Sequence, residues 1–174
     1  MKKFTLDDVD LRILNAVQLH GQVSKNKLAE LVNLSPTPCL LRLTKLKNAG
    51  FITGYTGNIA LHKLFDLTTV YVTVSLNSHR RSDFQLFENY IKNVDEVVEC
   101  YATGGGTDYV LKVVAMSLQD FQDLIETMLD AEIGIARYYI YVTTKTIKST
   151  ELSVAKLSRK KKERELQLQN APEN

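Results

Sequence analysis

The segment from Ser24 to Gly50 constrains the fold most strongly, because it carries start and stop signals for two short helices in close succession. Ser24 is a candidate N-cap for the first helix. Ser35 is a candidate N-cap for the second, with Pro36 at the first helical position, where a missing N–H costs nothing. Gly50 supplies the stop. Two capped helices separated by a tight turn are typical of a helix-turn-helix motif.

The second helix of this motif has one apolar and one polar face. Cys39, Leu43 and Leu46 recur at helical spacing and are predicted to face inward. The outward residues include hydrogen-bond donors and cations but no acid, and such side chains contact bases and phosphates in the DNA major groove. The alternative to DNA contact is that these residues form an ordinary solvated helix face. The short turn between the two capped helices favours binding in the DNA groove. We therefore predict DNA contacts from Ser35, Thr37, Pro38, Arg42, Thr44, Lys45 and Lys47.

The residues before this motif predict a third helix. Thr5 precedes an amphipathic segment that Gly21 closes, and Asp7, Asp8 and Asp10 crowd its positive end. This helix is long enough to support the other two, which gives a three-helix DNA-binding domain over residues 1–52. Residues 53–66 are predicted to form a linker strand or hairpin, because they combine strand-forming residues with two glycines.

From Leu67 the hydrophobic period changes to that of a strand. The pattern predicts strands over 67–76, 97–102, 109–115 and 136–147, with helices over 82–92 and 118–129. This βαββαβ order is typical of a ferredoxin-like domain, whose four-stranded antiparallel sheet has both helices on one side. The fold class is therefore α+β. The second domain spans residues 67–150, and residues 151–174 form a charged C-terminal tail.

The predicted open face of the sheet is rich in tyrosine and hydroxyl groups. It carries Thr69, Tyr71, Thr73, Tyr101, Tyr139 and Tyr141. Tyrosine is enriched where an apolar surface meets a partly wet contact. We hypothesise that two such sheets meet in a dimer.

Charge is distributed by domain, although the net charge is only +2. Residues 1–60 carry +4, residues 61–150 carry −4 and residues 151–174 carry +2. A basic N-terminal segment is typical of a nucleic-acid-binding domain. The alternative is that this charge difference is chance variation, because the counts are small. The tail can form a charged helix. Lys160–Lys162 could contact phosphates, and the alternative is that the tail is simply solvated. Glu163 and Glu165 favour the solvated tail because they interrupt the run of positive charge.

Several functional classes lack their signatures. No apolar run reaches membrane-spanning length and no signal peptide is visible, so the expected location is the cytoplasm, with no membrane partner. Cys39 and Cys100 form neither a metal motif nor a disulfide framework. The three histidines are scattered, and nucleophile-elbow and phosphate-loop motifs are missing, so we expect no enzyme, no catalytic residue, no metal and no cofactor. RNA-recognition modules share the βαββαβ order, but the third strand lacks their signature and the segment is acidic.

Four segments resemble the Lrp/AsnC family of transcription regulators. In the N-terminal part they are the pattern LDxxDxxIL at residues 6–14 and residues 27–55. In the C-terminal part they are TGGGTDYVLKV at residues 103–113 and IKST at residues 147–150. The resemblance implies a winged-type helix-turn-helix domain joined to an effector-sensing domain, in a dimer or octamer that binds double-stranded DNA. It also implies that a free amino acid or related metabolite binds between C-terminal domains. The implied pocket residues are Gly104, Gly105, Asp108 and Thr150, with Tyr101 nearby.

The chemistry of that pocket is consistent with an amino acid. Glycine N–H groups can hold a carboxylate and Asp108 an ammonium, although an Asp after three glycines is also ordinary turn chemistry. The chain departs from the family pattern at Leu41, Gly104 and Glu151. We predict a sequence-specific DNA-binding transcription regulator, modulated by an amino acid. An amino-acid-sensing protein-interaction module without a specific DNA target is the alternative.

Overall fold

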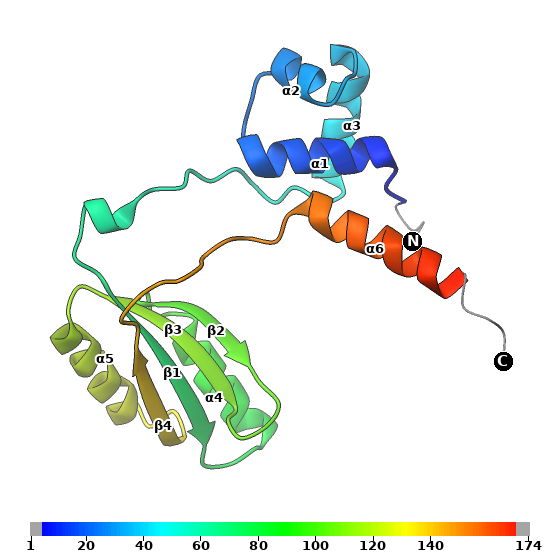
Figure 1. Cartoon of the computed structure of the whole chain (residues 1–174). Helices are drawn as coiled ribbons and strands as arrows, with labels where there is room; N and C mark the ends of the chain where they lie inside the picture. Colours follow the sequence, from blue (N-terminus) through cyan, green and yellow to red (C-terminus); the bar gives the residue numbers. More distant parts are fainter. Residues whose placement is uncertain (1–4, 170–174) are drawn as a thin grey trace. The chain divides into compact units, whose positions relative to one another are not determined.

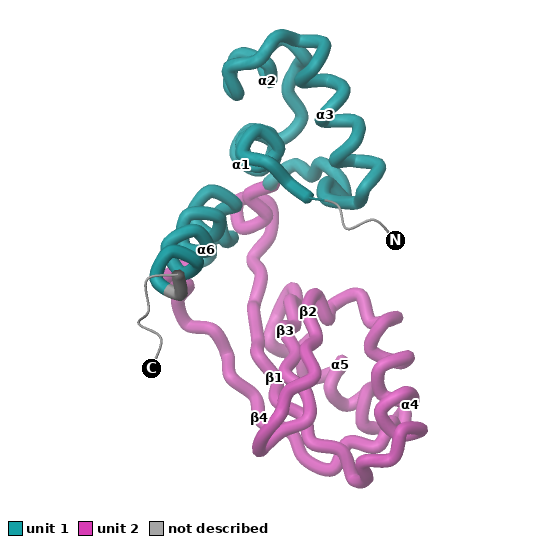
Figure 2. Tube along the Cα trace, turned by 90° about the vertical axis from the view of Figure 1, so that its right-hand side faces the viewer, with its two compact units in different colours: residues 1–58, 149–174 teal, residues 59–148 magenta. Residues whose placement is uncertain are grey.

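The computed structural model describes residues 5–169, among which it places six α-helices and four β-strands (Figure 1). These elements form two compact units. Unit 1 combines residues 1–58 with 149–174, and unit 2 comprises residues 59–148 (Figure 2). The chain therefore passes from unit 1 through unit 2 and back into unit 1.

All regular secondary structure in the described part of unit 1 is helical. It contains α1 (Asp8–His20), α2 (Lys25–Leu31), α3 (Pro36–Asn48) and α6 (Val154–Gln169). The first three helices confirm the predicted three-helix arrangement. The predicted charged helix of the tail is also present, as α6, and it belongs to the same compact unit as the helix-turn-helix.

Of the two serine caps predicted in unit 1, one is confirmed, and α1 is capped by Asp7, which was not predicted as a cap. Asp7 and Asp10 form a reciprocal capping box at α1, in which each side chain accepts a hydrogen bond from the other residue's backbone N–H. Ser24 Oγ accepts from the Lys27 N–H at α2, as predicted. Ser35 occupies the N-cap position of α3, but its hydroxyl makes no capping hydrogen bond, so Pro36 carries the start of that helix.

The core of unit 1 contains the apolar stripes of α1, α2 and α3. Cys39 and Leu46 of α3 are buried, as their spacing predicts, and Leu43 packs at the edge of the cluster. The other buried members are Ile13, Ala16, Leu28, Ala29 and Val32. The stripe fixes which side of α3 faces inward and therefore which side is exposed.

Unit 2 confirms the ferredoxin-like order. Its elements are β1 (Thr68–Leu76), α4 (Arg81–Ile91), β2 (Val97–Ala102), β3 (Tyr109–Ala115), α5 (Leu118–Asp130) and β4 (Ile135–Val142). The strands lie in the order β2-β3-β1-β4, and every neighbouring pair is antiparallel. The fold class is therefore α+β, as predicted.

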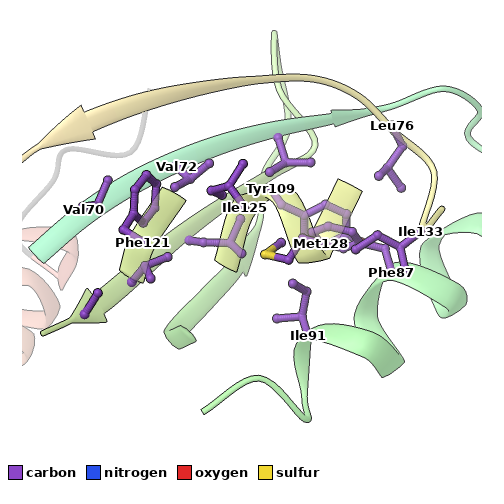
Figure 3. Close-up of a cluster of buried hydrophobic side chains, with 14 residues drawn as sticks. Val70, Val72, Leu76, Phe87, Ile91, Tyr109, Phe121, Ile125, Met128 and Ile133 are labelled. Carbon is purple, nitrogen blue, oxygen red and sulfur yellow. The ribbon is translucent and has the colours of Figure 1, made fainter. Parts of the chain in front are cut away.

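The core of unit 2 lies between one face of the sheet and the two helices. Figure 3 shows Phe87 of α4 and Phe121 of α5 among the side chains packed against Val70 and Val72 of β1. Alternate residues of β1 and β3 are buried in this cluster, because successive side chains of a strand point to opposite faces. Both helices thus cover the same face, and the other face of the sheet is open.

Two predicted strand segments are wrong. No strand is present over residues 53–66 of the described chain, where the structure has extended backbone and a short 3₁₀ helix, η1 (Leu61–Lys63). A single extended segment has no neighbouring strand with which to form a ladder. The last strand ends at Val142 rather than Ile147, because its partner β1 begins at Thr68 and the final bond joins Thr143 N–H to the Thr69 carbonyl.

Within residues 5–169, none of the helices combines the length and apolar composition needed to cross a lipid bilayer.

Candidate functional site

The outward face of α3 is a compact polar surface on the helix-turn-helix. Thr37, Thr44 and Lys45 are exposed on the side opposite the buried Cys39 and Leu46. Pro38 is exposed on the same side of the helix, Ser35 is exposed at its start, and Leu41 is 67% exposed between them. This face offers hydroxyl groups, one ammonium group and an apolar contact for the methyl group of thymine.

Arg42 is placed differently from the other predicted contacts. Its Nη1 atom lies 2.6 Å from Asp7 Oδ2 and 2.8 Å from Asp10 Oδ1. Asp10 is only 4% exposed, and a buried carboxylate requires a charged or hydrogen-bonding partner. Arg42 therefore connects the middle of α3 to the start of α1 and fixes the orientation of the recognition helix.

The pKa values at this cluster follow from its geometry. The Asp10 backbone N–H and then the Arg42 guanidinium hold the pKa of Asp7 below its ordinary value. The hydrogen bonds to Asp10 and Asp7 in turn raise the pKa of Arg42. Asp7 and Arg42 are therefore charged at neutral pH, and the guanidinium is committed to contacts within the protein.

Lys47 also makes a contact inside unit 1. Its Nζ atom lies 4.8 Å from the centroid of the Tyr55 ring, in a cation–π arrangement. This contact fastens the end of α3 to the segment that follows it. Of the seven predicted DNA contacts, Ser35, Thr37, Pro38, Thr44 and Lys45 lie at the exposed start or face of α3, whereas Arg42 and Lys47 also contact other segments of unit 1.

Unit 2 contains a cavity of about 490 Å³ at the end of β1. The loop 103–108 between β2 and β3 and the start of β4 form its other walls. Its lining residues are Ser75, Leu76, His79, Gly105, Gly106, Thr107, Asp108, Ala136 and Arg137. The volume is within the range of about 300–1,000 Å³ that is usual for small-molecule sites.

Asp108 organises one wall of this cavity. Its Oδ2 atom accepts a hydrogen bond of 2.8 Å from the Leu76 backbone N–H, and its Oδ1 atom lies 3.0 Å from His79 Nε2. Its backbone N–H donates to the Val74 carbonyl, so the residue is held to β1 through both main chain and side chain. The carboxylate thus stabilises the loop and presents negative charge at the cavity wall.

Arg137 supplies the opposite charge. It pairs with Ser75 in the β1–β4 register, which places it beside the end of β1. Its guanidinium lies 5.7 Å from the Tyr139 ring centroid. Gly105 has a φ of 134°, a backbone conformation that a side chain would strain, so the loop there is built on glycine. The cavity therefore has an anionic and a cationic group as well as exposed backbone.

The structure brings together two of the five residues implied for the effector site. Gly105 and Asp108 line the cavity, whereas Gly104 does not. Tyr101 lies on the open face of the sheet, where its hydroxyl donates to Glu99, and Thr150 belongs to unit 1. Sequence reasoning missed His79 and Arg137. Their place at the cavity depends on strand register and on the turn after β1, and no local motif encodes either.

Neither cysteine has the properties of a nucleophile. Burial raises the pKa of the Cys39 thiol, and burial together with Glu88 raises that of Cys100. The thiolate form, which carries the reactivity of cysteine, is therefore disfavoured in both.

Comparison with known families agrees with this division into two units. Residues 6–53 match the winged helix-turn-helix DNA-binding family, and residues 69–152 match the Lrp/AsnC ligand binding domain. A helix-turn-helix joined to a ligand-binding domain defines a DNA-binding transcription regulator and not an enzyme, as expected.

The chain belongs to the Lrp/AsnC family of transcriptional regulators. It is 39% identical over 150 residues to the transcriptional regulatory protein DoeX of Halomonas elongata, covering 86% of this chain and 95% of that protein. It is 34% identical over 152 residues to the leucine-responsive regulatory protein of Escherichia coli, covering 87% and 92%.

Solved structures show the same fold. A Neisseria meningitidis transcriptional regulator in complex with L-Met superposes with a TM-score of 0.81 at 28% identity, covering 88% of this chain and 99% of that one. An AsnC family regulator from Agrobacterium tumefaciens superposes with a TM-score of 0.80 at 29% identity, covering 87% and 99%.

Proposed function

We propose that this regulator reads a specific duplex sequence through the outward face of α3, as a dimer or larger assembly, under the control of an amino acid or related metabolite. The observation that supports the proposal of sequence-specific DNA binding is the group of exposed side chains on α3. Thr37, Leu41, Thr44 and Lys45 are presented together, while the opposite stripe is buried. Major-groove readers place three or four side chains on base edges in this way.

The proposed contacts divide by role. Thr37 and Thr44 meet base edges or thymine methyl groups, and Leu41 adds an apolar contact. Lys45 and Ser35 contact phosphate groups. Arg42 is proposed to position α3, since its Nη1 atom is within 2.8 Å of both Asp7 and Asp10. Lys47 can bind a phosphate only if its contact with the Tyr55 ring is broken.

The cavity of unit 2 is the proposed effector site. An amino acid carries both an ammonium and a carboxylate, and the cavity offers Asp108 to the first and Arg137 with the loop backbone to the second. The structurally similar Neisseria regulator was solved with L-Met, and a relative in Escherichia coli is named for leucine, which supports an amino acid here.

The open face of the unit 2 sheet is the proposed dimer surface. In the β1–β4 register Tyr71 pairs with Tyr141 and Thr73 with Tyr139, so the tyrosines lie side by side. Tyr101 of β2 is also exposed, and Tyr71, Tyr139 and Tyr141 are each at least 42% exposed. Such an aromatic surface is costly to leave in water, and a second copy of the sheet would cover it.

Selection of duplexes from a random pool at physiological salt tests the DNA-reading proposal. The wild-type protein should enrich one motif with two half-sites separated by about one helical turn or a multiple of it. Thr44→Ala should change the enriched bases, whereas Gln85→Ala on α4 should leave the motif unaltered. Recovery of random duplexes without a common motif by the wild-type protein would refute the proposal.

A further inference from the structure

The last helix follows the region matched by the ligand-binding family model. The ligand-binding match ends at residue 152, and the DoeX and Escherichia coli relatives are covered over 92% or more of their length by 86–87% of this chain. Helix α6 (Val154–Gln169) follows that boundary and joins unit 1. It therefore lies beyond the matched ligand-binding domain and belongs to the same compact unit as the helix-turn-helix.

Helix α6 is bound to α1 at its start and near its middle. The Gln18 side chain donates from Nε2 to the Leu152 carbonyl and accepts at Oε1 from the Val154 N–H, both at 2.8 Å. Lys162 Nζ lies 2.6 Å from Asp8 Oδ1. Between these contacts the two helices enclose a groove whose lining includes Ala155, Ser158 and Leu166 from α6. These contacts define which face of α6 is turned toward α1.

The cations of α6 fall into two groups. Three of them form ion pairs: Arg159 with Glu163, Lys161 with Glu165 and Lys162 with Asp8. The other three, Lys156, Lys160 and Arg164, are exposed, and they form no ion pair within residues 5–169. The two glutamates that interrupt the basic run therefore pair with Arg159 and Lys161 and not with the second group.

Lys156, Lys160 and Arg164 form a continuous row, which we call the α6 stripe. They follow one another at a spacing of four residues, so they lie on one face of the helix, about 6 Å apart along its axis. At about 100° per residue this row faces away from Ala155 and Lys162, which line the groove against α1, whereas Arg159 and Glu163 lie between the row and the groove. The stripe is thus a linear cationic surface turned away from the helix-turn-helix core.

The stripe does not belong to the surface of α3. In both Figure 1 and Figure 2, α6 lies on the side of α1 away from α2, and Figure 2 shows α3 and α6 on different sides of α1. Any anion that it holds is therefore bound separately from the groove that α3 is proposed to read. Duplex DNA carries one phosphate per about 3.4 Å of axis on each strand, so a row about 12 Å long faces three or four of them.

We propose that the α6 stripe binds the phosphate backbone of duplex DNA without reading its sequence, in addition to the contacts of α3. The proposal rests on the DNA-reading function of unit 1. Three flexible cations in a row, whose neighbouring acid Glu163 is paired with Arg159, fit a regular polyanion better than a shaped protein surface. The bound duplex is either the flank of the operator or a second segment.

Salt titration of binding to a duplex that lacks the selected motif tests this inference. The variant Lys156→Gln/Lys160→Gln/Arg164→Gln removes the stripe. The matched control Lys63→Gln/Lys92→Gln/Lys145→Gln removes the same charge from exposed positions of unit 2. Loss of three phosphate contacts should reduce the slope of log K against log salt by about 2.7 per chain. Between 50 and 200 mM salt the wild type should then lose about 40-fold more affinity than the stripe variant.

The controls separate this inference from the function on which it rests. Lys156→Arg/Lys160→Arg should keep the wild-type slope, and the melting temperature of every variant should equal that of the wild type. The stripe variant should still enrich the wild-type motif, because α3 is unchanged. A wild-type protein that enriches no motif would refute the DNA-reading proposal. Motif enrichment with an identical slope in the stripe variant would refute only the role of α6.

Two further results would also overturn the role of α6. An equal fall in slope for the stripe variant and the unit 2 control would show that net charge alone is responsible. An unchanged slope on DNA, together with stripe-dependent binding to phosphatidylserine vesicles, would assign the stripe to a membrane surface.

Discussion

Arg42 shows how a single side chain can change role once its neighbours are known. A cation on a recognition helix is expected to meet DNA, yet here two carboxylates of α1 hold it, one of them buried. Removal of the guanidinium would leave the Asp10 carboxylate without its charged partner in a desolvated place. The effect on DNA binding should therefore come through the position of α3.

Arg42→Ala should lower the melting temperature of unit 1, followed by far-ultraviolet circular dichroism, and weaken operator binding without changing its salt dependence. Lys45→Ala is the contrasting variant, since loss of a phosphate contact should reduce the salt slope by about 1. The double variant Asp10→Ala/Arg42→Ala should be less unstable than the sum of the single variants. An unaltered melting temperature with relaxed base selectivity in Arg42→Ala would instead return Arg42 to the base contacts.

The same cluster should make unit 1 sensitive to acid. The Asp10 N–H and the Arg42 guanidinium lower the folded-state pKa of Asp7, whose unfolded value is about 3.9. The stabilisation is therefore complete above that unfolded pKa and is lost as pH falls through the lower folded pKa. Asp7→Asn keeps a capping side chain but removes the charge, so its stability should change less between pH 5 and pH 2 than that of the wild type.

Urea unfolding at a series of pH values measures this difference. Asp66→Asn is the matched control, because Asp66 is exposed and forms no ion pair within the described residues. The control should retain the acid sensitivity of the wild type. Equal pH profiles for Asp7→Asn and wild type would show that this carboxylate does not stabilise the folded state.

At the scale of elements, the sheet and its two helices hold together through large buried side chains. Phe87 of α4 is fully buried beneath the sheet, whereas the neighbouring Leu86 is 51% exposed. Phe87→Ala should lower the free energy of unfolding of unit 2 by about 3–5 kcal/mol, because it removes apolar contacts and leaves a cavity. Leu86→Ala should change it by less than about 0.5 kcal/mol.

Tyrosine fluorescence is a convenient probe for this comparison. The chain contains no tryptophan, and all of its tyrosines except Tyr55 lie in unit 2. Urea titration followed at the tyrosine signal therefore reports on unit 2. Similar losses for the two variants would mean that α4 does not pack through Phe87 as the structure has it.

The elements were predictable where the pattern of apolar residues was strong and local. The alternation in β1 and the helical spacing of α5 each identified an element to within one residue of its bounds. The end of β4 and the linker after Gly50 were not predictable in this way. Both depend on where a partner strand begins or whether one exists. The identity of residues such as Tyr55 or Thr144 does not indicate whether a partner strand lies beside them.

The candidate sites were less predictable than the elements, for a related reason. The face of α3 follows from Cys39 and Leu46 alone, so its exposed residues could be named in advance. The cavity of unit 2 is assembled from three separate segments, and the contribution of Arg137 depends on its register with Ser75. Likewise, the ion pairs that commit Arg42 connect residues more than thirty positions apart.

At the scale of the whole molecule, the tyrosine-lined sheet face should determine assembly. Sedimentation at micromolar concentration should show a dimer or a larger species for the wild-type protein. Tyr141→Asp places a charge beside Tyr71 at the centre of this face and should weaken self-association about tenfold or more. Gln85→Asp on α4, which covers the opposite face, should leave the assembly intact. A monomeric wild-type protein would remove the dimer from the proposed function.

Effector binding should appear as a change in the stability of unit 2. A ligand that binds only the folded state adds about 2.7 kcal/mol at 100 times its dissociation constant, so thermal melting against each amino acid identifies the effector. Arg137→Gln should abolish or strongly reduce the shift, because it removes the cation that faces the ligand carboxylate. Arg81→Gln removes a cation of unit 2 that is not in the cavity lining and should retain the shift. A shift that survives Arg137→Gln would place the effector elsewhere, and the absence of any shift would indicate a regulator that is not controlled by amino acids.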